Sequence, residues 1–395
     1  MRFILFYSGI ESFNYFTDEI QNELKSLGHD TFILDLRDAN NAPGHSLKDL
    51  LDYTKSKVHA AIGYDQMPCI GSAYVDLWND LDIPVISIFM DPPYRFGDYN
   101  LNLPQKYIRF CCDIEHVTWC KRFHSDTMPN VYFLPHAATI PDVLPPFWED
   151  KKFDVLFSGT YYSPDSYIST IKEKYDVDRR NLILDIIDFM VAHPAYSFNT
   201  AVDRILSIKG YNADDNIRLQ IMNSSEEADW FIRMYYREKV IGAVLSSGIQ
   251  LHVLGRGWEN YPNFSNKSFH HISQRVAFAS SLDYIANSKV NINIMPWYKD
   301  GTHDRVLNTL LRNSVPLTDP SLYMKEHFND KESIFYYELD KLDRLPTTLV
   351  DILSSPSESK SVIEHGKTIV MKNYTLSSIV NELIKASNAF IATYC

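Results

Sequence analysis

The sequence predicts an α/β protein built from two doubly wound parallel-sheet domains. Short apolar runs alternate with segments of helical spacing through the first 140 residues, and strand and helix patterns return after residue 150. Between them, residues 135–150 hold four prolines and lose this periodicity, which is typical of a linker. The 395 residues are enough for two such domains. We therefore expect a first domain at 1–140, a linker at 141–150 and a second domain at 151–375.

The composition limits the classes of function. A formal net charge of −12 argues against nonspecific binding to nucleic acid. No apolar run approaches the roughly 20 residues of a membrane helix, and no secretory signal pattern is present, so we expect a soluble, cytoplasmic protein without a transmembrane segment. The five cysteines indicate reduced thiols in a chain of this length. Cysteine and histidine alternate every four residues over 112–124, but a straight helix would spread them over about 18 Å, so we expect no metal site.

The first domain begins with a continuous apolar run, Phe3–Tyr7, typical of a parallel strand buried on both faces. The following segment has apolar residues at helical spacing and ends at Gly28. Further strands are predicted at 31–36, 58–62 and 85–90, with helices near 46–55 and 72–79. No G-x-G-x-x-G turn follows the first strand, so we do not expect a dinucleotide cofactor.

Three polar residues of this domain follow predicted strands and are candidates for catalysis. Asp91 follows the strand at 85–90, at the edge where open α/β sheets bind ligands. Glu11 lies in the first strand-to-helix loop, and His136 ends a strand that begins at Val131. Each has a structural alternative. Asp91 would form a turn ahead of two prolines, Glu11 would be a surface carboxylate, and His136 would cap its strand.

The second domain begins with strand Phe153–Phe157, and Gly159 in the next turn would let the backbone approach a ligand closely. An ordinary tight turn is the alternative. Residues 164–240 then show helical spacing without a catalytic motif. We expect a helical insertion that packs on the second domain and offers a surface for oligomer formation.

A glycine turn follows the next strand, Ile249–Leu254. Gly255 and Gly257 allow close approach of the backbone to a phosphate, and Arg256 offers a fork of donors suited to it. A surface arginine is the alternative for Arg256. The aromatic rings of Trp258 and Tyr298 are candidates for stacking on a base, although core packing is the more frequent use of such residues.

Residues 290–320 predict a strand, a polar loop, a helix over His303–Arg312 and a second strand at 315–317. Asn313 suits the left-handed position that ends a helix. Backbone N–H groups at a helix N-terminus favour an anion, and His303 and Arg305 add cationic capacity there. With Gly301 and Thr302 in the loop, this unit predicts a site for a phosphate-bearing ligand.

These motifs, in this order, resemble the CgeB-like glycosyltransferases. The resembling segments are Asp91-Pro92-Pro93, Leu134-Pro135, Phe157–Thr160, Gly255-Arg256-Gly257-Trp258, Gly301-x-His303-x-Arg305 and Leu317-Thr318-Asp319. They cover nearly the whole chain outside the helical insertion. Asn308 stands where the family has glutamate, and Asn313 stands where it has glycine.

The resemblance implies the GT-B fold, with two Rossmann-like domains facing a cleft and a final helix, 376–395, that returns to the first domain. It implies transfer of a hexosyl group from a UDP- or GDP-linked donor to a hydroxyl of a glycan or protein, with no further cofactor. The donor contacts would be Gly159, Gly255, Arg256, Gly257, Tyr298, Gly301, Thr302, His303, Arg305 and Asn308, and the catalytic candidates are Asp91, His136 and Glu11. Cationic side chains and a helix N-terminus would neutralise the leaving diphosphate without an obligatory metal. The alternative is an inactive GT-B chain that binds nucleotide sugars or assists another transferase. Asn308, in place of the family's glutamate, leaves this alternative open.

Overall fold

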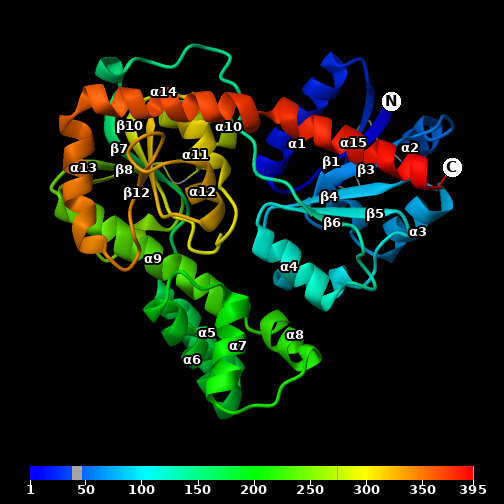
Figure 1. Cartoon of the computed structure of the whole chain (residues 1–395), viewed down its shortest axis with the longest axis horizontal. Helices are drawn as coiled ribbons and strands as arrows, with labels where there is room; N and C mark the ends of the chain where they lie inside the picture. Colours follow the sequence, from blue (N-terminus) through cyan, green and yellow to red (C-terminus); the bar gives the residue numbers. More distant parts are fainter. Residues whose placement is uncertain (38–46, 274, 395) are drawn as a thin grey trace. The chain divides into compact units, whose positions relative to one another are not determined.

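The computed structural model describes residues 1–37, 47–273 and 275–394. The chain divides into two compact units, residues 1–139 together with the segment from residue 374 onward, and residues 140–373. Each unit contains one six-stranded sheet in which all neighbouring strands are parallel (Figure 1). The predicted α/β class with two doubly wound sheets is therefore confirmed. Within the described residues, every helix is too short or too polar to cross a membrane.

The first unit has the strand order β2-β1-β3-β4-β5-β6. Its strands are β1 (Arg2–Tyr7), β2 (Asp30–Asp35), β3 (Ala60–Tyr64), β4 (Val85–Phe89), β5 (Tyr107–Cys111) and β6 (Val131–Phe133). Its helices are α1 (Glu11–Ser26), α2 (Leu47–Tyr53), α3 (Ser72–Asp80), α4 (Ile114–Phe123) and α15 (Leu376–Tyr394). The apolar run of β1 is second from one edge of the sheet and has a neighbour on each side, with Phe3 paired to Thr31 of β2 and to Ala60 of β3. Helix α15 packs against α1. A β-bridge between Ala138 and Thr375 joins the residue before α15 to the end of the segment 1–139.

The second unit has the strand order β12-β11-β10-β7-β8-β9. Its strands are β7 (Phe153–Ser158), β8 (Leu251–Leu254), β9 (Phe269–Ser273), β10 (Ser288–Asn293), β11 (Val315–Thr318) and β12 (Phe335–Tyr336). Outside the insertion, its helices are α10 (Phe278–Ala286), α11 (Asp304–Leu311), α12 (Leu322–His327), α13 (Leu345–Ser354) and α14 (Pro356–Asn373). Strand β9 was not predicted, because three of its five residues are histidine or serine and it lacks the apolar run of a central parallel strand. Short 3₁₀ segments complete the two units: η1 (Met67–Cys69), η2 (Pro93–Asn100), η3 (Trp148–Asp150), η4 (Trp258–Asn260) and η5 (Leu342–Arg344).

The segment between β7 and β8 is entirely helical, as predicted, and appears in green in Figure 1. It contains α5 (Pro164–Lys174), α6 (Val177–Ala192), α7 (Phe198–Ile208), α8 (Asp215–Asn223) and α9 (Glu226–Ser246). Helix α9 continues six residues beyond the predicted end of the insertion at residue 240, and its buried face packs against α5, α6 and α13. The insertion is thus joined to the unit through one long, largely buried helix.

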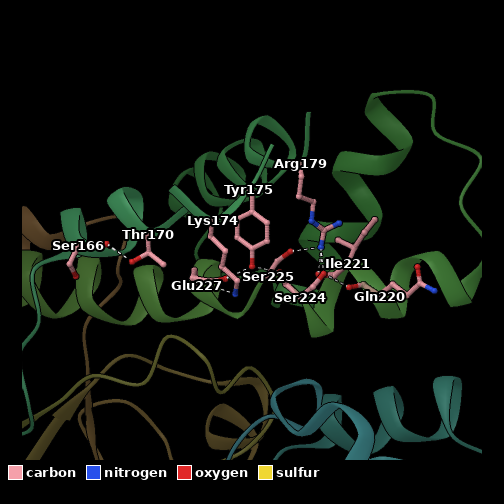
Figure 2. A network of polar contacts seen from close by, with 10 residues as sticks. All are labelled: Ser166, Thr170, Lys174, Tyr175, Arg179, Gln220, Ile221, Ser224, Ser225 and Glu227. Carbon is pink, nitrogen blue, oxygen red and sulfur yellow. Dashed lines mark hydrogen bonds and ion pairs between the residues drawn. The ribbon is translucent and has the colours of Figure 1, made fainter. Parts of the chain in front are cut away.

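A polar network joins two corners inside this insertion (Figure 2). Lys174 at the end of α5 forms an ion pair with Glu227 at the start of α9, with an N–O distance of 2.7 Å. Tyr175 donates to the same carboxylate at 3.0 Å, and Arg179 on α6 donates to Ile221 O at 2.9 Å and to Ser225 Oγ at 2.7 Å. Because these contacts join the α5–α6 corner to the α8–α9 corner, they fix where α9 begins.

Candidate functional site

The two glycines of the 255–257 turn are required by contact with another loop of the second unit. Gly255 and Gly257 have φ of 128° and 85°. A Cβ on Gly255 would lie 2.2 Å from Gly159 O, and one on Gly257 would lie 2.0 Å from Tyr161 O. Two backbone hydrogen bonds, Gly159 N to Leu254 O and Tyr161 N to Arg256 O, both 2.9 Å long, join the loops. The glycines therefore serve first to let the loops after β7 and β8 pack backbone against backbone.

The aromatic and basic residues of this turn have different environments. Trp258 is fully buried, stacks on Tyr161 at a centroid distance of 5.1 Å and donates its indole N–H to Gly159 O at 2.7 Å. Core packing is therefore the role of Trp258. Arg256 is exposed, and the structure records no side-chain hydrogen bond or ion pair for it within the described residues.

The N-terminus of α11 carries the predicted cationic residues. The helix begins at Asp304, one residue later than predicted, and His303 is its N-cap, with Nδ1 accepting the N–H of Arg305 at 3.2 Å. Burial, together with the charges of Arg305 and Arg237, lowers the pKa of His303 despite the neighbouring Asp304 carboxylate 2.8 Å away. Nδ1 itself is the atom that lies 2.8 Å from Asp304 Oδ1, so it is within reach of both this carboxylate and the Arg305 N–H.

Arg305 is held at the end of strand β10. Its Nη1 donates to Asn293 Oδ1 at 3.0 Å, and Asn293 in turn donates to Thr318 Oγ1 at 2.9 Å. Burial lowers the pKa of Arg305, so its charge lies in an environment poor in water. Thr302, immediately before the N-cap, is fully buried, and its hydroxyl has no hydrogen-bond partner in the described part of the chain.

The structure adds a residue that the sequence analysis did not assign to the site, Arg237 on helix α9. Its guanidinium is 8% exposed, donates to the Thr160 carbonyl through Nη1, and lies 5.5 Å from the Phe157 ring centroid. Arg305 lies 5.9 Å from the centroid of the same ring, so both guanidinium groups lie around the end of strand β7. Arg237 forms no ion pair with any described carboxylate, and its Nε is buried without a partner.

The cations of this cluster repel one another. Burial, followed by the charges of Arg305 and Arg233, lowers the pKa of Arg237 to about 9. Arg233 is compensated, since it forms a 2.9 Å ion pair with Asp229 and lies 4.1 Å from the centroid of the Trp297 ring. A buried charge without a counter-ion is costly, so Arg237 and Arg305 together create a site that an anion would stabilise.

Two further predicted donor residues are buried. Tyr298 is 4% exposed, with its ring centroid 6.0 Å from that of His303. Asn308 is fully buried, and its Oδ1 accepts a hydrogen bond from Arg312 at 2.9 Å within α11. This contact favours a structural role for Asn308 over the expected contact with the donor. Asn313 has φ of 54°, the predicted left-handed conformation.

In the first unit, Asp91 follows β4 and forms an ion pair with Arg95 at 2.9 Å. The Asp91 side chain is 40% exposed, whereas Arg95 is 8% exposed. Asp65, which follows β3 and was not predicted, is buried and accepts the N–H of Met90 at 2.9 Å. Burial, followed by the charge of Asp91, raises the pKa of Asp65, so the two carboxyl groups lie in contrasting environments at neighbouring strand ends.

The other two catalytic candidates are at different strand ends. His136 is 6% exposed and lines a small cavity of about 30 Å³ with Cys112 and with Leu376 and Ile379 of α15. Helix α15 therefore covers His136. Glu11 is the exposed first residue of α1, after β1.

Comparison with known proteins supports the fold and part of the sequence. Residues 237–385 match a family model described as glycosyl transferase-like, a segment that begins at Arg237 and includes the glycine turn and α11. No curated protein sequence matches the chain.

Several solved structures share the fold over both chains. Sucrose-phosphate synthase from Thermosynechococcus elongatus has a TM-score of 0.58 at 8% identity, covering 100% of each chain. A glycosyltransferase from Rickettsia africae has a TM-score of 0.55 at 10% identity, covering 99% of this chain and 98% of that one. T4 phage BGT, in complex with its UDP-glucose substrate, has a TM-score of 0.55 at 11% identity, again covering 99% and 98%. The fold of this chain is therefore the GT-B fold of glycosyltransferases.

Proposed function

We propose that this protein is a glycosyltransferase that moves a hexosyl group from a UDP- or GDP-linked donor to a hydroxyl of a glycan or protein. The observation that carries the proposal is the pair of guanidinium groups of Arg237, which is buried, and Arg305, which is partly buried, around the ends of β7 and β10. Guanidinium groups match the paired oxygens of a phosphate, and a diphosphate would supply the missing negative charge. The match of residues 237–385 to a glycosyl transferase-like model supports the same assignment.

In the proposed reaction, the bond between the anomeric carbon and the diphosphate oxygen breaks, and its electrons remain on the diphosphate. Arg237, Arg305 and the N-terminus of α11 would stabilise that growing charge without a metal ion. His303, whose pKa is lowered by burial, would contact the diphosphate from the same helix start. The acceptor hydroxyl must lose a proton, and Asp91 is the base that we propose, with His136 and Glu11 as the other candidates.

The GT-B fold also accommodates an inactive nucleotide-sugar-binding chain, and Asn308 in place of a glutamate suggested this alternative. In the structure, Asn308 is fully buried and holds Arg312. This contact supports a structural reason for the asparagine, so we give Asn308 little weight against catalysis. We therefore propose that the protein is an active enzyme, and that its relatives are the CgeB-like glycosyltransferases.

A thermal-shift series with UDP, GDP and their hexose conjugates tests the proposal. A ligand that binds only the native state raises Tm, by an amount equivalent to about 2.7 kcal/mol at 100 times its Kd. We expect one nucleotide series to raise Tm in the presence of EDTA and its sugar conjugate to be slowly hydrolysed. If no nucleotide shifts Tm, the proposed donor class is wrong. Binding without hydrolysis or transfer would favour the inactive alternative, and activity that requires added manganese or magnesium would contradict metal independence.

A further inference from the structure

A second pocket lies in the same unit at the carboxyl ends of strands β10, β11 and β12. Its volume is about 480 Å³, and the loops that follow these three strands line it. The corner between α6 and α7, residues 192–196, forms another wall. The pocket is thus built jointly by the strand-end loops and the helical insertion.

The insertion contributes a braced aromatic ring to this pocket. Tyr196 is 41% exposed and stacks on Phe189 with a centroid distance of 5.7 Å and an interplanar angle of 20°. Lys299, from the loop after β10, donates to Pro194 O at 2.6 Å and holds the corner in place. Tyr196 therefore presents a fixed apolar face that loses little conformational entropy when a ligand packs on it.

Carboxyl groups from the strand-end loops also line the pocket. Asp319 is 3% exposed and accepts the N–H of Met295 at 2.8 Å, and burial raises its pKa to about 6. Asp340 is exposed, and the structure records no ion pair for it among the described residues. Glu338 is a third carboxyl residue in the lining, and Lys299 and Lys325 also line it, so the pocket carries charged groups of both signs.

An aromatic face beside carboxylate acceptors suits a neutral ligand rich in hydroxyl groups. The C–H faces of a sugar ring pack on an aromatic ring, while carboxylates accept hydrogen bonds from its hydroxyls. We propose that this pocket binds a sugar ring of a glycan acceptor, an assignment that rests on the proposed glycosyl transfer. Loop 295–303 connects the two sites, since Tyr298 lines the pocket and lies 6.0 Å from His303 by ring centroids.

The test measures saccharide and nucleotide binding separately on the full-length chain. Saturation-transfer NMR with maltose, cellobiose, lactose and chitobiose reports on the pocket, and calorimetry with UDP and GDP reports on the anion site. The variants are Tyr196→Ala, Tyr196→Phe and Asp340→Asn. Tyr211→Ala is the matched control, because Tyr211 is 57% exposed in the same insertion and does not line the pocket.

We expect at least one disaccharide to bind the wild type, and Tyr196→Ala to weaken it about fivefold or more. Tyr196→Phe and Tyr211→Ala should retain binding, Asp340→Asn should weaken it, and nucleotide affinity should stay unchanged throughout. The proposal is overturned if no disaccharide binds or if disaccharide binding survives Tyr196→Ala. It is also overturned if Tyr196→Ala weakens the binding of a UDP-hexose but not that of UDP, because this result would place the donor sugar in the pocket. Nucleotide binding without saccharide binding would refute this pocket alone, whereas saccharide binding without nucleotide binding would refute the proposed function.

Discussion

The carboxyl edges of the two sheets have the same strand geometry and opposite electrostatics. In the first unit, carboxyl groups follow β3 and β4, and the exposed one, Asp91, is already paired with Arg95. In the second unit, guanidinium groups lie around the ends of β7 and β10, and Arg237 has no carboxylate partner among the described residues. Parallel strands place polar groups at one edge in both units.

This difference indicates which kind of ligand each edge can bind. An edge with a buried arginine that lacks a carboxylate partner among the described residues carries an electrostatic penalty that an anionic ligand would reduce. An edge with a buried carboxyl of raised pKa beside a partly exposed carboxylate suits proton transfer better than anion binding. The two edges thus differ in the ligand chemistry that each can hold by itself, anions in the second unit and hydrogen-bond donors in the first.

The largest expected effect tests the first edge. Asp91→Asn should lower kcat by about 10²- to 10⁴-fold, the usual contribution of a general base, and leave nucleotide affinity unchanged. Steady-state kinetics and calorimetry measure the two quantities. Asp82→Asn is the control, since its exposed ion pair with Lys106 lies in the same unit and contributes little. If the variant loses stability but keeps its kcat, Asp91 has a structural role in the turn before Pro92 and is not the base.

The second prediction concerns the backbone contact at the other edge. Gly255→Ala should lower the free energy of unfolding by about 3 kcal/mol or more, because its Cβ would overlap Gly159 O at 2.2 Å. Gly9→Ala, in the first loop of the other unit, meets no atom within 4 Å and should be nearly neutral. Denaturant unfolding of both variants measures the difference. Equal stability of the two would mean that the 255–257 turn does not need its glycines.

The third prediction separates Arg237 from the exposed Arg256. Arg237→Met should weaken nucleotide binding by roughly 1.5–3 kcal/mol, the scale of a lost hydrogen bond to a charged group. The same variant should raise the Tm of the free protein, because it removes a buried charge that lacks a counter-ion. Arg256→Met should change affinity by less than about threefold. If Arg256→Met loses more nucleotide affinity than Arg237→Met, the anion site lies at the 255–257 turn instead.

The fourth prediction decides the role of Asn308. Since it is buried and accepts a hydrogen bond from Arg312, Asn308→Ala should cost about 1–2 kcal/mol of stability, with donor KM unchanged. Unfolding measurements and kinetics at varied donor concentration distinguish the alternatives. A raised donor KM with intact stability would make Asn308 a donor contact.

The smallest effect is a pH dependence at the first edge. Burial and Asp91 raise the pKa of Asp65 above the ordinary carboxyl value near 3.9, so the stability it contributes is present at low pH and is lost as the pH rises. Asp65→Asn cannot ionise, and it should flatten the decline in Tm between pH 5 and 8 by an amount equivalent to about 1 kcal/mol. An unchanged pH profile would mean that Asp65 ionises normally when folded.

The sequence by itself determined the fold class and the location of the strand-end loops. Buried parallel strands need continuous apolar runs, and the helices between them need apolar residues at helical spacing, so these elements are visible locally. His303, Arg305 and the glycine turn were found in the same way, because a helix N-terminus and a glycine pair are local signals. The edge strand β9 was missed since it is buried on fewer sides and its sequence is mostly polar.

Only the tertiary structure decided which charges meet. Arg237 donates to a carbonyl 77 residues earlier in the chain, and no local pattern distinguishes it from the other arginines of helix α9. The same holds for Lys151, which is buried and joins the ends of α10 and α11 by donating to Ala286 O at 2.6 Å and Arg312 O at 3.2 Å. Periodicity reports which face of an element is buried, but a charge acquires its role from partners distant in sequence, and those partners are set by packing.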